Sequence, residues 1–146
     1  MGKQTTIKVP LKTERYEIFA ICSNLNVFQF CATLNNLLSI DLQGQKPREI
    51  EINGMRVQPL HYSFVNPIDK VTTTVVENQV NGRPLLDYLK NITFFVKLSP
   101  VVSDEQLTDF QQKLSESGMF TFVQRISRQN FTKQQENTFN AIFQYV

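Results

Sequence analysis

The sequence has little of what catalytic and metal-binding proteins use. It contains one histidine and two cysteines, and its five glycines are isolated from one another. Cys22, Cys31 and His61 are too few to form a disulfide framework or a recognisable four-ligand zinc site. Isolated glycines cannot form the glycine-rich loop that cradles phosphates in nucleotide-binding enzymes. We therefore expect no cofactor and no metal.

Charge is also scarce. Charged residues make up 19% of the chain, and the formal net charge is +2. Lysine and arginine are interleaved with acidic residues and form no basic stripe of the kind that binds nucleic acid. No apolar run is long enough to cross a bilayer, and residues 1–12 lack the apolar core of a signal peptide. We expect a cytoplasmic protein with no membrane partner, and the charge pattern places nucleic acid second to protein as a partner.

Apolar residues are plentiful enough to form a core. They make up 41% of the 146 residues, and the chain has twelve phenylalanines and no tryptophan. This length is close to that of one ordinary domain, and no linker rich in glycine, proline or serine divides it. The sequence predicts a single α+β domain over residues 1–146, with the phenylalanines as interior packing material.

The first half of the chain begins with a strand and a helix. Residues 14–23 have β-branched and aromatic side chains at strand density, and residues 24–40 repeat apolar side chains at helical spacing. Asn24 or Asn26 can cap the helix. Residues 48–60 alternate around an Asn-Gly pair that favours a tight hairpin turn. The following stretch to residue 78 predicts two more strands joined at "NPID".

The second half returns to strands and helices. Residues 92–99, "ITFFVKLS", predict an apolar strand. Ser103 with Gln106 forms a capping-box pattern that begins a helix. Residues 119–127 predict a strand, and a second capping box at Thr132 begins a last helix. The order indicates an α+β fold with a mixed, mainly antiparallel sheet, helices packed on one face, and strand-helix units at both ends of a central β-meander.

The stretch "GMFTFV" resembles the glycine-aromatic strand of RNA-recognition motifs. Such a motif displays aromatic rings on two adjacent strands, but this strand is second in its unit rather than third. Phe120 and Phe122 share one face of a strand, and we expect them in the core. Phe95 is the better candidate for exposure, because Phe94 and Val96 take the opposite face. A sheet face bearing Phe95 is the basis of an alternative function, binding of single-stranded nucleic acid.

Reactive side chains occur without a catalytic arrangement. Cys22 stands between a strand and a helix, where a thiolate can be stabilised, but only His61 could serve as its base. His61 lies in a strand-like segment, which favours a structural role. Asp104, Glu105 and Asp109 lie at a helix N-terminus, where the helix dipole favours acidic residues without any catalysis. We predict that the protein is not an enzyme.

Residues 80–91, "VNGRPLLDYLKN", form an irregular segment with apolar and aromatic side chains. Leu85, Leu86 and Tyr88 could form a recognition loop, because loops carry function more often than sheets. They could equally form a flap over the core. The leading hypothesis is a protein-protein interaction or assembly module that uses this loop or an exposed sheet edge, with another protein or a second copy of the chain as partner.

Most of the chain, in order, resembles a known family. "YEIFAICSNLNVFQFCATLNNLLSIDL" is similar to the strand and helix that open the IPExxxVDY proteins of Bacteroidota, and "LLDYLKNITFFVKL" falls where their naming motif lies. The ending "NFTKQQENTFNAIF" is compatible with that family. The resemblance implies a small cytoplasmic bacterial protein and supplies no mechanism.

Overall fold

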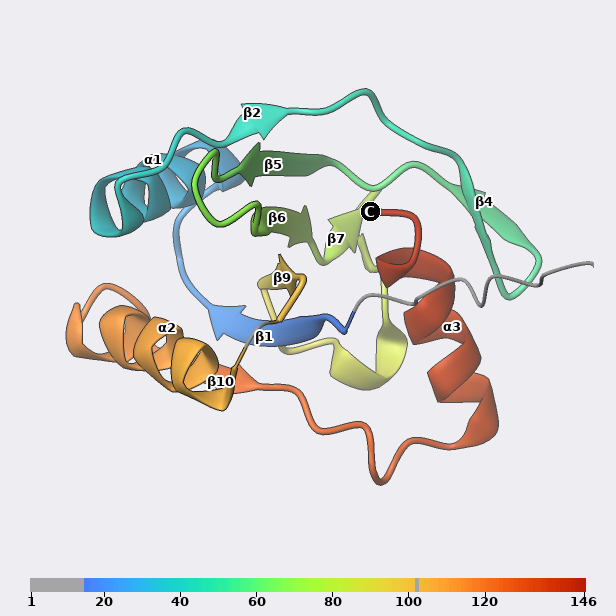
Figure 1. The fold of residues 1–146 in the computed structure, drawn as a ribbon. Coiled ribbons are helices and arrows are strands. Elements are labelled where there is room, and N and C mark those ends of the chain that lie inside the picture. Colours follow the sequence, from blue (N-terminus) through green and yellow to red (C-terminus); the bar gives the residue numbers. More distant parts are fainter. Residues whose placement is uncertain (1–14, 102) are drawn as a thin grey trace, which may run out of the picture.

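One sheet forms the centre of the molecule, and Figure 1 shows helices on both of its sides. The structure is a computed structural model that describes residues 15–101 and 103–146. The N-terminal stretch that argues against a signal peptide lies outside these residues. The sheet has six strands, in the spatial order β10 (Phe122–Arg125), β1 (Glu17–Cys22), β9 (Phe94–Ser99), β6 (Thr72–Glu77), β5 (His61–Val65) and β2 (Gln43–Gly44).

All neighbouring strands of this sheet pair antiparallel. The predicted α+β class is confirmed, and the two strands predicted between residues 60 and 78 pair as β5 and β6, whereas the hairpin predicted before them forms a separate two-stranded sheet. The prediction of a mixed sheet is wrong for the described strands. α2 (Asp104–Glu116) connects β9 to β10, which run parallel, but β1 lies between them and pairs antiparallel with both.

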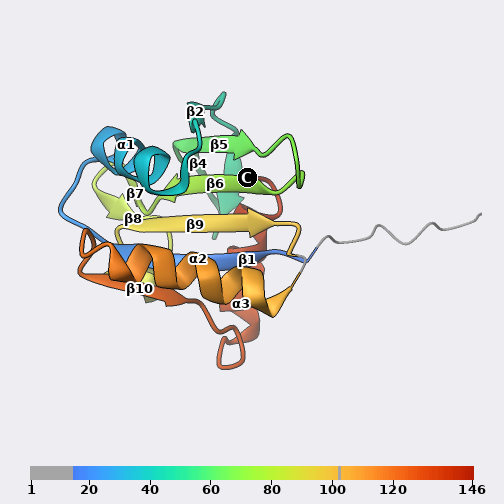
Figure 2. The ribbon, with the colours of Figure 1, turned by 60° about the vertical axis from the view of Figure 1, so that its left-hand side comes forward.

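Two helices cover one face of the sheet. α1 (Val27–Leu38) and α2 lie in front of the strands in Figure 2. Alternate residues of the central strands point toward these helices because successive side chains of a strand face opposite ways. This first core contains buried side chains from the strands and from both helices, including Phe19, Ile21, Phe30, Leu34, Val75, Phe94, Val96, Leu107 and Leu114.

The opposite face is covered as well, so the prediction of helices on one face is wrong. α3 (Lys133–Phe143) packs there, and its apolar stripe needs a sheet face of its own because α1 and α2 occupy the first. The residues of the central strands that alternate with those of the first core pack against α3. This second core includes Ile18, Ile50, Ile52, Val76, Leu85, Leu86, Phe95, Phe139, Ile142 and Phe143.

Short elements extend the second core around α3. A hairpin is formed by β3 (Ile50–Ile52) and β4 (Met55–Val57), and a smaller one by β7 (Gln79–Val80) and β8 (Arg83–Pro84). A 3₁₀ helix, η1 (Asp87–Leu89), follows the second hairpin. The segments of residues 50–57 and 79–89 therefore share a layer with α3.

Local capping residues behave as the sequence predicts. The Asn26 side chain accepts a hydrogen bond from the backbone amide of Gln29, whose own side chain accepts from the amide of Asn26, and this capping box begins α1. Thr132 begins α3 through the same arrangement, and the Ser103 hydroxyl accepts from the third amide of α2. The predicted hairpin turn is confirmed by the positive φ of Asn53, 51°, which precedes a glycine.

The expectation that the phenylalanines lie in the interior holds with two exceptions. Phe120 packs against Phe30, with 5.4 Å between ring centroids. Phe122 is 42% exposed. β10 begins at this residue, so Phe120 lies outside the strand, and strand alternation does not place the two rings on one face. Phe28, on the outer side of α1, is 71% exposed. The prediction for Phe122 is therefore wrong.

Candidate functional site

A buried asparagine holds the loop that the sequence identifies as a candidate interaction segment. Asn78 follows β6 and is fully buried. Its side-chain amide donates to the backbone oxygens of Leu89 and Ile92, both at 2.9 Å, and its oxygen accepts from the amide of Leu86 at 3.1 Å. The backbone amide of Asn78 donates to the backbone oxygen of Thr93, and its backbone oxygen accepts from the amide of Leu85. Asn78 therefore fixes both ends of the loop on the sheet.

The leucines of this loop point inward. Leu85 and Leu86 are 7% and 1% exposed and belong to the second core, as expected for a flap over the core. Tyr88 is half-buried, and its hydroxyl donates to the backbone oxygen of Gln135 at 2.7 Å. Burial raises the pKa of Tyr88 above its ordinary value. Of these three side chains, only Tyr88 keeps a substantial surface.

Phe95 lies in the interior, so the prediction of its exposure is wrong. The side chain is completely buried, and its ring meets that of Phe143 edge-to-face at 5.4 Å between centroids. The predicted alternation is correct, since Phe95 and Phe94 face opposite sides, but α3 covers the side that seemed open. Nucleic-acid binding by stacking needs exposed rings, and Phe95 offers none.

A groove of about 600 Å³ lies between the β3–β4 hairpin and the loop held by Asn78. Its lining comes from both hairpins, from η1 and from α3, and its apolar members are Ile52, Met55, Val57, Val80, Pro84, Leu85 and Leu86. A smaller polar hollow of about 370 Å³ shares Asn53, Asp87, Tyr88 and Thr138 with it. The leucines that the sequence singles out thus contribute to a concave surface rather than to a protruding one.

The rim of the groove carries more positive than negative charge. Arg56 and Arg83 line it from the two hairpins, and Asp87 lines it from η1. Arg56 forms an exposed ion pair with Glu49 at 3.4 Å, and such pairs contribute little because water screens them. Arg83 forms no ion pair with any described residue. Met55 precedes Arg56 in β4, also lines the groove, and is 56% exposed.

The candidate catalytic residues are not assembled. Cys22 donates from its Sγ to the backbone oxygen of Asn91 at 3.2 Å. Its only available base, His61, lies on β5, and two strands separate β5 from β1. Three steps of about 4.8 Å between neighbouring strands place the two elements roughly 14 Å apart, too far for proton transfer. Cys31 is buried in the first core, which raises the pKa of its thiol to about 11.

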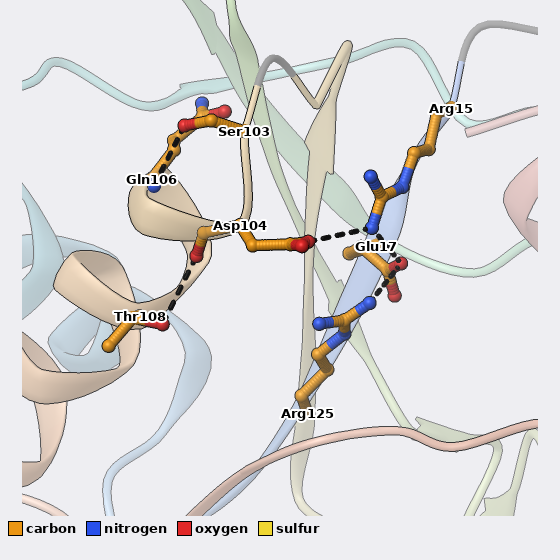
Figure 3. Close-up of polar contacts among 7 residues, drawn as sticks. All are labelled: Arg15, Glu17, Ser103, Asp104, Gln106, Thr108 and Arg125. Atoms are coloured by element: carbon orange, nitrogen blue, oxygen red, sulfur yellow. Dashed lines mark hydrogen bonds and ion pairs between the residues drawn. The ribbon is translucent and has the colours of Figure 1, made fainter.

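Of the acidic residues predicted at the start of α2, Asp104 belongs to an ion-pair cluster, shown in Figure 3. Asp104 pairs with Arg15 at 3.1 Å, and Glu17 pairs with Arg125 at 2.6 Å and with Arg15 at 3.6 Å. The hydrogen bond that Arg125 donates to the Glu17 carboxylate raises the pKa of Arg125 above its ordinary value. The cluster ties β1 and β10 to the first turn of α2, which is a structural role. Glu105 and Asp109 are exposed on α2.

Comparison with models of known protein families finds no match, and comparison with curated proteins finds none either. The resemblance to the IPExxxVDY proteins therefore stays a prediction. Within residues 15–101 and 103–146, no helix is both long and apolar enough to span a bilayer. The same residues contain no group of three or more histidine, cysteine or acidic side chains placed to hold a metal.

One wall of the groove, residues 80–91, is predictable from the sequence. Asn78 and the wall formed by β3 and β4 are not. Asn78 begins the polar stretch "NQVNGRP", which has the composition of a solvated loop, and no local pattern distinguishes a buried asparagine there. Arg56 lies in a hairpin that is predicted correctly, but its position opposite Arg83 depends on tertiary packing.

Proposed function

We propose that this chain is a non-enzymatic interaction module that binds a segment of another protein in the groove between its two hairpins. The observation that carries the proposal is an apolar floor beneath a rim bearing Arg56 and Arg83. The matching partner segment has apolar side chains that fill the groove and acidic side chains beside them. Complementary charges of this kind give specificity and speed association.

The composition of the groove supports a peptide as occupant. Sites for small molecules and peptides are concave and mostly apolar, with a few polar groups that fix orientation. Met55 gives the rim a flexible, polarizable side chain that adapts to different apolar partners. Backbone polar groups of a bound segment would find Asn53 and the edge of η1 at the polar end of the groove.

We further propose that the protein works in the cytoplasm. Both cysteines are free, and Cys31 is packed in the first core as a small apolar side chain. Unpaired thiols are usual in reducing compartments. The resemblance of residues 16–42 to a family of Bacteroidota proteins favours a bacterial cell as the setting.

Selection of short random peptides displayed on phage, with the full chain immobilised, tests the groove. Peptides selected on the wild type should share apolar residues flanked by aspartate or glutamate. Their affinity should fall at least about tenfold for the variant Arg83→Glu, because attraction becomes repulsion. Met55→Glu should weaken binding for the same reason, with loss of apolar contact in addition.

The matched control is Lys113→Glu, which makes the same charge change on an exposed residue of α2, on the other face of the sheet. It should leave peptide affinity unchanged. Selected peptides that bind Arg83→Glu as well as the wild type would refute the groove as the site. Concentration-dependent dimerisation abolished by Arg83→Glu would mean that a second copy of the chain occupies the groove, and the peptide proposal would be replaced.

A further inference from the structure

A polar hollow of about 470 Å³ lies over β5 and β6, and it shares no described lining residue with the groove. His61 and Ser63 line it from β5, and Thr72 and Thr74 line it from β6. Ser63 is the antiparallel partner of Thr74, so both hydroxyls project from the same face of the sheet. That face carries three hydroxyl groups and one imidazole at the floor of an open depression.

The imidazole of His61 is buried without a complete set of hydrogen bonds. The residue is 7% exposed, and its Nδ1 has no hydrogen-bond partner among the described residues. A buried polar atom without a partner costs about 1–3 kcal/mol, and native proteins contain few of them. Burial lowers the pKa of His61, Arg48 lowers it further, and the carbonyl of Pro59 opposes the shift. The ring is therefore neutral at neutral pH, and it lines the hollow with its Nδ1 buried and unsatisfied.

The charged side chains that line the hollow are positive. Lys46 and Arg48 line it, and no described acidic side chain does. The Nη1 atom of Arg48 donates to the backbone oxygen of Tyr145 at 3.2 Å, which holds the guanidinium at the rim. Lys97, opposite Thr74 on the next strand, donates from its Nζ to backbone oxygens at the C-terminal end of α3. Lys46 forms no hydrogen bond or ion pair with the described residues.

We propose that this hollow binds the phosphate group of a small molecule, with Arg48, Lys46 and His61 as the recognising side chains. A guanidinium and an ammonium group make charge-assisted hydrogen bonds to phosphate oxygens, and the His61 imidazole adds a third donor when it takes up a proton beside the anion. The hydroxyls of Ser63 and Thr74 supply donors from the floor. A volume of about 470 Å³ lies in the range of small-molecule sites. The proposal is independent of peptide binding in the groove.

NMR of the imidazole tests the proposal directly, because His61 is the only histidine and its ring signals need no assignment. Inorganic phosphate is titrated into the full chain at constant ionic strength, with sodium chloride as the replaced salt. The ring nitrogen signals should shift and saturate. The pKa of His61 should rise in bound protein, because a neighbouring anion favours the protonated ring.

Variants identify the recognising side chains. Lys46→Ala removes an exposed side chain without known contacts and should weaken phosphate binding about tenfold. Lys113→Ala, on the other face of the sheet, is the control and should bind phosphate like the wild type. Equal thermal melting of both variants shows that the fold is kept.

Three outcomes overturn the proposal. Ring signals that move no more with phosphate than with chloride show that the hollow does not bind the anion. A saturable response that acetate produces equally well assigns the hollow to carboxylates instead. Phosphate binding that is unchanged in Lys46→Ala places the anion elsewhere on the molecule.

Discussion

Replacement of Asn78 by alanine tests how the groove is held together. The change removes three side-chain hydrogen bonds and takes away the partner of the Ile92 carbonyl and of the Leu86 amide, whereas the Leu89 carbonyl keeps the bond that it accepts from the amide of Ile92. Each such bond has a net value of about 0.5–1.5 kcal/mol, and burying an unpaired group costs about 1–3 kcal/mol. Water that enters the vacated space offsets part of this. We expect the free energy of unfolding to fall by about 3 kcal/mol, out of a total of about 5–15 kcal/mol for an ordinary domain.

Urea denaturation followed by circular dichroism measures the loss. With an m-value of about 1.5 kcal/mol per M, the midpoint should fall by about 2 M. The control is Gln79→Ala, which truncates the next polar side chain, an exposed one in β7. Its effect should stay within about 0.5 kcal/mol. A loss below about 1 kcal/mol for Asn78→Ala, or one equal to the control, would refute the role of the side chain.

Hydrogen exchange locates the effect within the loop. The amide of Leu86 donates to the Asn78 side chain, whereas the amide of Leu85 donates to the Asn78 backbone oxygen. Alanine removes the first acceptor and keeps the second. The Leu86 amide should therefore exchange faster in Asn78→Ala, with a smaller change at Leu85. Equal acceleration at both amides would indicate that the whole loop opens and that the side chain is not the specific clamp.

Four further measurements check the packing and the titrating groups. Phe95→Ala should lower the free energy of unfolding by about 3–5 kcal/mol, because the ring is completely buried against α3. Glu17→Gln should cost about 1 kcal/mol, since it weakens a partly exposed ion-pair cluster. Iodoacetamide should label Cys22 in the native protein and reach Cys31 only after unfolding, because Cys31 is buried with a pKa of about 11. The pKa of His61 is lowered from 6.5 in the folded state, so the unfolded chain binds the proton more tightly and stability should fall as the pH drops below about 6.5.

Each of these measurements has a result that contradicts it. A loss from Phe95→Ala no larger than that from Phe122→Ala would mean that the second face of the sheet is open. An unchanged urea midpoint in Glu17→Gln would show that the cluster of Figure 3 contributes nothing measurable. Rapid native labelling of Cys31 would contradict its burial. Stability that is constant between neutral pH and about pH 6 would contradict the lowered pKa of His61.

Local signals in the sequence account for the elements that are predicted correctly. The capping boxes at Asn26 and Thr132 and the turn at Asn53 depend on residues within a few positions of one another. The hydrogen bonds and backbone angles that define these caps and this turn therefore depend only on a short stretch of chain. For the same reason the strand-helix units and the β5–β6 pair follow from the sequence alone, although the strand order of the sheet does not.

The error about Phe95 shows where alternation alone is insufficient. Alternation correctly separates Phe94 from Phe95 but cannot say which face water reaches. A signal was present in the neighbouring strands: Ile18 and Val76 share the face of Phe95 and are apolar too. Central strands that are apolar on both faces are covered on both faces. Comparing the second face of all three strands would have predicted that the last helix packs against it.

Asn78 and His61 mark the limit of local reasoning, because both depend on groups far away in the sequence. The partners of the Asn78 side chain lie up to 14 residues away in the sequence. Residues 45–48 and 145–146, which line the hollow together with His61, come from other parts of the chain. An asparagine in a polar stretch and a histidine in a strand have ordinary local explanations. What distinguishes them is hydrogen bonding in three dimensions: Asn78 is buried with its side-chain amide satisfied, whereas His61 is buried with Nδ1 unsatisfied. The first condition stabilises a loop, and the second is the condition that a ligand can complete.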